Sequence, residues 1–230
     1  MNPSKIVITG TIASGKSTLS RLLSDLGFTV LSADETNRRL LEVGGLNYQA
    51  IKNSPSFTDA FDGDNLDKKK LAKIIFSDED KLLELNQLTH KNIVNELEKT
   101  IDSLDEKVVF VEIPLYFQMK EKFACDEVWL VTANHDTQVE RLMDRDNIDA
   151  SYAKEKIEKQ KEQIQMQEQS DVVFDNSGSV ADLIKELKIV LEKRIYYESF
   201  KIYRKSLRIY SSDSPYPSGS KLWGDCLPNI

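Results

Sequence analysis

The sequence predicts an α/β fold in which helices flank a five-stranded parallel sheet. Two observations lead to this prediction. Five short segments are rich in β-branched and aromatic residues, as strands buried on both faces are. These segments span residues 5–9, 28–31, 107–113, 127–131 and 171–174. Stretches with apolar residues at helical spacing lie between them, and strands that alternate with helices form parallel sheets with right-handed crossovers.

The first predicted strand leads into a glycine-rich loop and a helix. The strand at residues 5–9 ends at Gly10, and apolar residues at helical spacing then run through residues 14–26, where Gly27 closes the helix. The strand at residues 28–31 completes a βαβ unit of ordinary length.

Between the second and third strands the pattern is mostly helical. A helix begins near Asp34, residues 53–65 are rich in loop-forming residues, a short helix spans residues 66–76, and Asp78 can cap a long helix. We therefore expect an inserted helical domain over residues 34–103, which is a candidate substrate domain.

The rest of the chain supplies the other parts. Helices are predicted over residues 137–144 and 151–168, and the second is very polar, so residues 136–169 are a candidate lid. The aromatic-rich extension at residues 196–230 either packs on the chain's own core or serves as a partner or self-association surface. The remaining residues, 1–33, 104–135 and 170–195, are then expected to form the core around the sheet.

Composition limits the class of protein. The 230 residues carry a net charge of −7, which argues against a general nucleic-acid binder with a basic face. Cys125 and Cys226 lie far apart and form no metal-binding or disulfide pattern. No segment approaches the roughly 18 apolar residues of a membrane span, and the first strand begins too early for a signal peptide. We expect a cytoplasmic protein with no nucleic-acid or membrane partner; the sequence leaves its oligomeric state open.

The loop after the first strand carries a phosphate-binding motif. The pattern GxxxxGK[ST] is matched at every fixed position by Gly10, Thr11, Ile12, Ala13, Ser14, Gly15, Lys16 and Ser17. Glycines let the loop direct backbone N–H groups at phosphate oxygens, and the helix N-terminus adds partial positive charge. We expect Lys16 to reach the β- and γ-phosphates, Ser17 to ligate Mg²⁺, and Thr18 to contact the nucleotide. The sequence therefore predicts a P-loop phosphotransferase with ATP and Mg²⁺ as cofactors.

An aspartate follows the second predicted strand. Ligands of open α/β sheets bind beyond the carboxyl ends of the strands. Asp34 lies there and can take the proton of an attacking hydroxyl group. The alternative is that Asp34 only caps the helix that follows.

At this point the chain resembles the dephospho-coenzyme A kinase family. The resemblance covers about residues 5 to 195, in the family's order and spacing, and its specific elements are Ala33-Asp34, Ile113-Pro114-Leu115, the Gln-x-x-Arg-Leu-x-x-Arg of residues 138–145, and residues 175–178. It also includes the phosphate loop, residues 27–34, 71–76 and 82–90, and Gln160. The resemblance implies ATP-dependent phosphorylation of the ribose 3′-hydroxyl of dephospho-coenzyme A, the last step of coenzyme A biosynthesis, on a fold with a nucleotide core, a substrate domain and a lid.

The resemblance also implies roles for single residues. Asp34 would be the general base, Lys16 and Arg141 would stabilise the transferred group, and Arg145 and Asn176 would contact ATP, Asn176 at the adenine. Apart from the resemblance, Glu112 at a strand end could hold Mg²⁺ through water, as strand-end acids do in P-loop enzymes, although strands of this family often carry no acid there. The acceptor-binding residues would be Thr9, Asp34, His90, Pro114 and Leu115. The other interpretations are solvated helix charges for the arginines, a turn at Asn176 and a structural role for His90.

Four positions depart from the family pattern. Ser32 stands where the family has an aspartate, Lys91 where it has a proline, Gln118 where it has a glutamate, and Met166 where a basic residue is usual. Two alternatives therefore stay open beside the dephospho-coenzyme A kinase: another small-molecule P-loop kinase with a nucleotide or nucleoside acceptor, and a nucleotide-binding regulatory protein without turnover.

Overall fold

The computed structural model describes residues 3–114, 116–119, 121–158 and 163–194. The predictions for Leu115, for Gln160 and for the extension at 196–230 lie outside these residues. The chain divides into two compact units. The helical unit is built on Leu31–Glu106, and the sheet unit on Ser4–Val30 and the chain from Lys107 onward.

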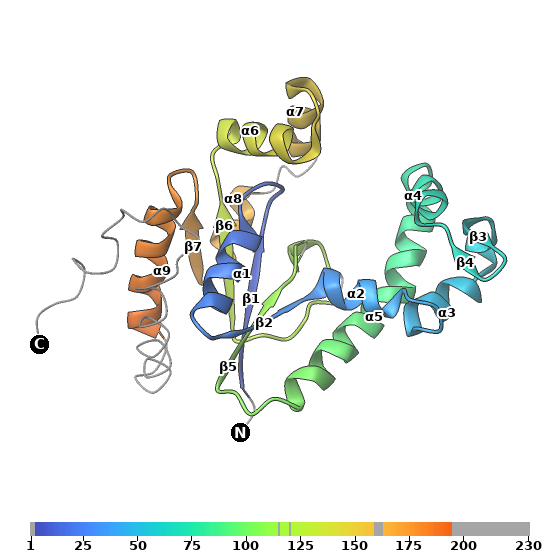
Figure 1. Ribbon diagram of the computed structural model, residues 1–230, viewed down its shortest axis with the longest axis horizontal. Coiled ribbons are helices and arrows are strands. Elements are labelled where there is room, and N and C mark those ends of the chain that lie inside the picture. Colours follow the sequence, from blue (N-terminus) through green and yellow to red (C-terminus); the bar gives the residue numbers. More distant parts are fainter. Residues whose placement is uncertain (1–2, 115, 120, 159–162, 195–230) are drawn as a thin grey trace, which may run out of the picture. The chain divides into compact units, whose positions relative to one another are not determined.

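A five-stranded parallel sheet forms the core of the fold and confirms the predicted fold class. Its strands lie in the order β2-β5-β1-β6-β7. They are β1 (Ser4–Gly10), β2 (Thr29–Ser32), β5 (Val108–Glu112), β6 (Glu127–Thr132) and β7 (Val172–Asp175). β1 pairs in parallel with both β5 and β6, and Ile8 lies opposite Glu112 on one side and Trp129 on the other. The carboxyl ends of these strands therefore meet at one edge, where β1 gives way to the glycine-rich loop (Figure 1).

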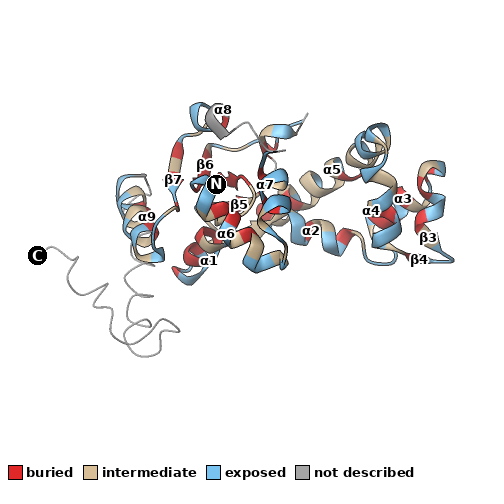
Figure 2. Ribbon diagram, turned by 90° about the horizontal axis from the view of Figure 1, so that it is seen from above, coloured by how far each residue is buried: buried red, intermediate tan, exposed pale blue. Residues whose placement is uncertain are grey.

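One face of the sheet is covered by α1 (Lys16–Asp25) and α9 (Val180–Arg194). Alternate residues of β1, Ile6 and Ile8, point into this layer and are almost completely buried. A row of aromatic rings crosses the strands with centroids 5.1–5.4 Å apart: Phe28, Phe110, Trp129 and Phe174. Figure 2 shows buried residues concentrated on the strands and on the sides of these helices that face them.

The candidate lid contains α6 (His135–Asp146), α7 (Ala150–Glu158) and α8 (Gln163–Glu168). α7 begins one residue before the predicted helix at 151–168 and α8 ends with it, and undescribed residues lie between α7 and α8. A small hydrophobic cluster joins α6 to α7 through Val139, Leu142, Ala153 and Ile157. Ile12 and Ala13 of the glycine-rich loop pack against it, so the loop and α6 share one apolar contact.

The helical unit has its own core, built around Tyr48, Ile51 and Phe57. Its elements are α2 (Ala33–Leu40), α3 (Leu46–Lys52), the 3₁₀ helix η1 (Pro55–Ala60), β3 (Phe61–Asp62), β4 (Asn65–Leu66), α4 (Lys68–Phe76) and α5 (Glu79–Asp102). The predicted cap of α5 is confirmed, because the Asp78 carboxylate accepts hydrogen bonds from the backbone of Asp80 and Lys81.

The structure differs from the sequence predictions for this unit at three places. Ser32, not Asp34, caps α2: its hydroxyl accepts a hydrogen bond from the Glu35 backbone N–H at 3.3 Å. The short helix α4 begins after Leu66, at Lys68, with Asp67 as its cap. The loop-rich stretch contains η1 and the β3–β4 hairpin, and the helix α3 before it was not foreseen. Within the described part of the chain, no helix has both the length and the hydropathy that crossing a membrane requires.

Candidate active site

The glycine-rich loop between β1 and α1 depends on three backbone positions. Gly15 has φ of 98° and Ala13 has φ of 56°, both in the left-handed region. For a residue with a side chain this conformation costs about 1–2 kcal/mol, so packing around the loop must hold Ala13 in place. Gly10 allows close contact, because a Cβ there would lie 2.2 Å from the Val131 carbonyl oxygen. The sequence thus forms an open curl that only glycine permits at Gly10 and Gly15.

Lys16 extends across this curl from the first turn of α1. Its ammonium Nζ donates hydrogen bonds to the carbonyl oxygens of Gly10 and Thr11, each at 2.9 Å. Ser17 is exposed beside it, and the Thr18 backbone N–H bonds to the Gly15 carbonyl at 3.0 Å. A positive charge and the N-terminus of α1 therefore meet at one loop, which is the arrangement that binds an anion.

Two buried carboxamide side chains hold the loop from outside. Gln138 on α6 donates from Nε2 to Thr11 Oγ1 and to the Ile12 carbonyl oxygen, both at 2.7 Å. Asn176, just after β7, donates from Nδ2 to the Ser14 carbonyl oxygen at 2.9 Å. The sequence motif Gln-x-x-Arg-Leu-x-x-Arg begins at Gln138 but does not by itself predict this role.

Three buried polar atoms around the loop have no hydrogen-bond partner among the described residues: Ser14 Oγ, Arg141 Nη1 and Asn176 Oδ1. Arg141 Nη1 lies 3.7 Å from the position that a Cβ on Gly15 would take. Buried polar groups in native proteins are nearly always paired. The guanidinium of Arg141 and the amide of Asn176 thus keep unused bonding capacity beside the loop.

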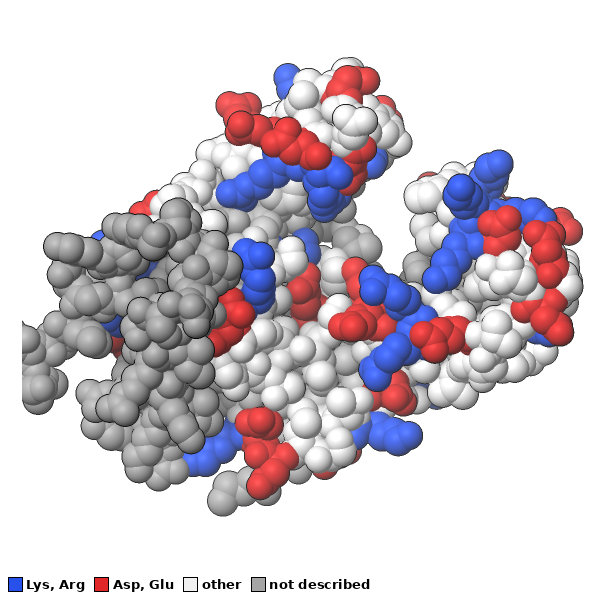
Figure 3. All heavy atoms as spheres, viewed as in Figure 1, with Lys and Arg blue, Asp and Glu red and all other residues white. Residues whose placement is uncertain are grey.

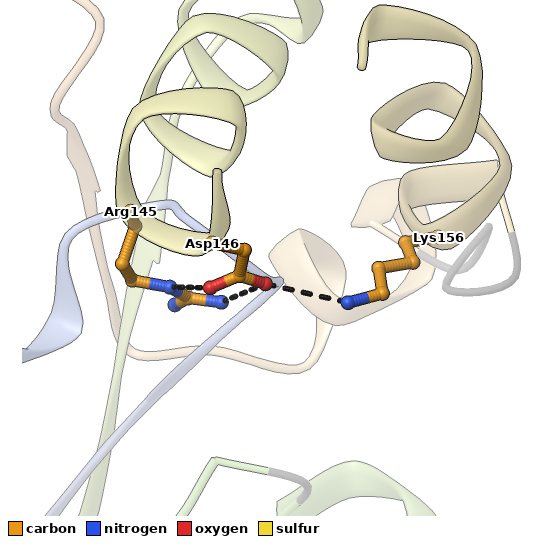
Figure 4. Close-up of polar contacts among 3 residues, drawn as sticks. All are labelled: Arg145, Asp146 and Lys156. Atoms are coloured by element: carbon orange, nitrogen blue, oxygen red, sulfur yellow. Dashed lines mark hydrogen bonds and ion pairs between the residues drawn. The ribbon is translucent and has the colours of Figure 1, made fainter. Parts of the chain in front are cut away.

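Arg145, one turn further along α6, is engaged with a neighbour. Its Nε and Nη2 donate to the Asp146 carboxylate at 2.8 and 3.3 Å, and Lys156 of α7 contacts the same carboxylate at 3.3 Å (Figure 4). The Arg145 hydrogen bonds, with help from Lys156, hold the pKa of Asp146 below its ordinary value, and the same pairing raises the pKa of Arg145. This ion-pair group joins the end of α6 to α7.

The charges of α6 divide between two sides of the helix. Asp136, Glu140 and Asp144 recur every four residues and so share one face, whereas Arg141 and Arg145 follow the same spacing on another. Figure 3 shows acidic side chains on the outer side of α6 and α7 and basic ones on the side toward the sheet. Positive charge therefore faces the edge of the sheet that carries the loop.

The strand end of β5 offers oxygen atoms next to α1. Glu112 Oε2 accepts a hydrogen bond of 2.6 Å from Ser20 Oγ, and Ser20 lies three residues after Ser17 on the same helix. One hydroxyl and one carboxylate suit Mg²⁺, which takes few protein ligands and fills its other positions with water and phosphate oxygens. Thr9, by contrast, is buried, and its hydroxyl donates to the Pro114 carbonyl oxygen at 3.2 Å.

The other predicted acceptor residues belong to the helical unit. Asp34 is exposed in the first turn of α2, after the cap at Ser32. His90 is half-buried in α5, and burial lowers its pKa. Of the other positions that depart from the family pattern, Lys91 and Gln118 are exposed, whereas Met166 is buried.

Known proteins of one family share the sequence pattern of this chain. The family model for dephospho-CoA kinase matches residues 5–182. The chain is also 35% identical over 191 residues to the dephospho-CoA kinase of Carboxydothermus hydrogenoformans, an alignment that covers 82% of this chain and 93% of that protein. The chain belongs to the dephospho-CoA kinase family.

Solved structures agree with membership of the dephospho-CoA kinase family. The protein TT1252 from Thermus thermophilus matches with a TM-score of 0.74 and 31% identity, covering 85% of this chain and 100% of that one. The dephospho-CoA kinase from Campylobacter jejuni matches with a TM-score of 0.53 and 25% identity, covering 84% and 98%. As a member of this kinase family, the chain is an enzyme that uses ATP.

Proposed function

We propose that this protein transfers the γ-phosphoryl group of ATP to the ribose 3′-hydroxyl of dephospho-CoA, giving CoA and ADP. The observation that carries the proposal is the phosphate loop, in which the Lys16 ammonium lies within hydrogen-bond distance of two loop carbonyl groups. The identity of the acceptor is inferred from relatives that are named dephospho-CoA kinase. This reaction is the last step of coenzyme A biosynthesis.

In this proposal the chain binds and neutralises the triphosphate. Lys16 would exchange its two carbonyl contacts for phosphate oxygens, and backbone N–H groups of the loop would bind the remaining oxygens. Arg141, with an unpaired Nη1 beside Gly15, would meet negative charge that grows as the phosphoryl group leaves ADP. Arg145 and Asn176 would complete the ATP site, Asn176 through its unpaired carboxamide oxygen.

Mg²⁺ is also part of the proposal. Ser17 would hold it directly and Glu112 through water, since the donor atoms near α1 are oxygens. When bound, the ion neutralises charge on the phosphate groups.

Acceptor chemistry is assigned to the other unit. Asp34 would take the proton from the 3′-hydroxyl as its oxygen bonds to phosphorus and the bond to ADP breaks. We further propose that residues 34–103 bind dephospho-CoA with the help of His90, and that Thr9, Pro114 and Leu115 contribute on the sheet side. Residues 136–169 would act as the lid that excludes water from the transfer.

A cytoplasmic location is part of the same proposal, and cell fractionation tests it.

A coupled assay of ADP release tests the function. It uses Mg²⁺, ATP and dephospho-CoA, with a panel of nucleosides and nucleotides as competing acceptors. We expect turnover with dephospho-CoA and its loss in Asp34→Asn, while Glu35→Gln, an exposed neighbour in α2, serves as the matched control. Turnover with another acceptor, or ATP binding without turnover, would contradict the proposal and support one of the two alternatives raised by Ser32, Lys91 and Gln118.

A further inference from the structure

Gln138 is a buried residue on α6 that the proposed chemistry does not use. Its side chain is 2% exposed. Its Nε2 donates hydrogen bonds to Thr11 Oγ1 and to the Ile12 carbonyl oxygen, both at 2.7 Å and both in the phosphate loop. These partners are 126 and 127 residues away in the chain, so the contact joins two distant elements.

The contact falls on the part of the loop that needs support. Ala13, next to Ile12, has the left-handed φ of 56° that side chains disfavour. A loop that presents its N–H groups to an anion turns its carbonyl groups outward, and a buried carbonyl must find a donor. Gln138 supplies that donor to the Ile12 carbonyl group from a side chain that is itself buried. Asn176 does the same for the Ser14 carbonyl group.

Gln138 also sits where the loop meets α6. Ile12 and Ala13 pack against the hydrophobic cluster that Val139 and Leu142 of this helix form with α7. Arg141 follows Gln138 by three residues and therefore shares its side of α6. A shift of Gln138 would displace the loop and the guanidinium together.

We propose that Gln138 is a positioning residue that holds Thr11 and Ile12 in the phosphate-binding conformation before the nucleotide arrives. The proposal rests on the proposed use of ATP at this loop. It differs from a simple packing role because it predicts a selective loss of affinity for phosphate chains. It also predicts that the affinity for the acceptor changes less than the affinity for phosphate chains.

Isothermal titration with inorganic tripolyphosphate tests this directly, because tripolyphosphate carries neither adenine nor ribose. Gln138→Glu keeps the shape of the side chain but replaces the N–H donor with an oxygen that faces the Ile12 carbonyl group. We expect the dissociation constant of Gln138→Glu for tripolyphosphate to rise at least about tenfold, equivalent to about 1.4 kcal/mol. The KM for ATP should rise in parallel, with a smaller change in the KM for dephospho-CoA.

Thr132→Val is the matched control. Thr132 is also buried, at 5% exposure, and its hydroxyl donates to the Phe174 carbonyl oxygen at 3.1 Å, a bond between β6 and β7 that does not involve the loop. The variant loses a buried hydrogen bond of similar depth, so it should lower the melting temperature without weakening tripolyphosphate binding.

A second pair of variants keeps the test decisive if Gln138→Glu does not fold. Thr11→Val removes one partner of Gln138 and should weaken tripolyphosphate binding, whereas Thr11→Ser retains the oxygen and should restore it. Three results would overturn the positioning role. Folded Gln138→Glu could bind tripolyphosphate as tightly as the wild type, or Gln138→Glu and Thr132→Val could lose the same affinity. The two Thr11 variants could also bind tripolyphosphate equally well. If the wild type binds neither tripolyphosphate nor ATP, the proposed function itself fails, which is a separate result.

Discussion

Gly15 shows how one missing side chain shapes the site. A Cβ at this position would lie 2.0 Å from Asn176 Nδ2, and φ is 98°. Gly15→Ala should therefore both strain the backbone and push Asn176 away from the Ser14 carbonyl group. We expect ATP binding to weaken by about 100-fold, because such combined strain costs roughly 3 kcal/mol or more. Fluorescence titration with a labelled ATP analogue measures this.

Gly44 provides the matched control for Gly15. Its φ is 88°, but no atom lies within 4 Å of a Cβ built there. Gly44→Ala should cost about 1–2 kcal/mol of unfolding free energy from the left-handed backbone alone. Its ATP affinity should equal that of the wild type. Equal ATP affinity in both variants would show that contact with Asn176 does not matter.

Arg141 should matter more for the rate than for binding. Its Nη1 is buried without a partner among the described residues, so it is available to charge that develops during transfer. We expect Arg141→Ala to lower kcat on the order of 10²–10³-fold with a much smaller change in ATP affinity. Glu140→Ala, on the exposed acidic side of α6, is the control and should keep wild-type kinetics. An unchanged kcat in Arg141→Ala removes this residue from the mechanism.

At the scale of elements, the Asp146 ion-pair group should make the junction of α6 and α7 sensitive to acid. Arg145 and Lys156 lower the pKa of Asp146 in the folded state relative to the unfolded chain. Its stabilising contribution is therefore present above about pH 4 and is lost as the pH falls through the lowered pKa. The melting temperature of wild type should exceed that of Asp146→Asn at neutral pH, and the gap should close in acid.

Melting curves of both proteins between pH 3 and pH 7 check this. Asp149→Asn is a useful comparison at the start of the neighbouring helix, because the Asp149 carboxylate accepts a hydrogen bond from the Tyr152 backbone N–H rather than from a cationic side chain. A gap between wild type and Asp146→Asn that stays constant over the whole range would contradict the assignment.

Element length explains which parts of the fold the sequence could predict. All five strands were placed within one or two residues, because continuous apolar runs and the loop motif mark them. The seven-residue α3 and the two-residue strands β3 and β4 are too short to show a period. The cap of α2 was misassigned because Ser32 and Asp34 are both good capping residues, and only the end of β2 decides between them.

The site residues likewise divide into those that a local sequence pattern predicts and those that depend on distant contacts. Residues 10–17 were predicted from a local motif whose backbone geometry follows from its glycines. Gln138 was missed because its partners lie more than a hundred residues away, and no local pattern reports such a contact. The pairing of Arg145 with Asp146 was likewise hidden, since adjacent opposite charges are common on solvated helices. The roles assigned to Asp34, His90 and Arg141 stay predictions.

At the scale of the whole molecule, the two units should respond to different ligands. Each has its own hydrophobic core, so each can change its local stability separately. We expect a non-hydrolysable ATP analogue to slow amide hydrogen exchange at residues 10–18 and along α6. Dephospho-CoA alone should slow exchange within Leu31–Glu106, because α2 and α5 carry Asp34 and His90.

Two variants separate these responses in hydrogen-exchange mass spectrometry. Lys16→Ala should lose the protection caused by the ATP analogue and keep that caused by dephospho-CoA, since Lys16 belongs to the sheet unit. Asp34→Asn should keep the full response to the ATP analogue, because Asp34 is assigned to proton transfer and not to the triphosphate. If dephospho-CoA slows exchange only in the sheet unit, the assignment of residues 34–103 as the substrate domain is refuted. If it slows exchange in the helical unit even in Lys16→Ala, the acceptor binds independently of the phosphate loop.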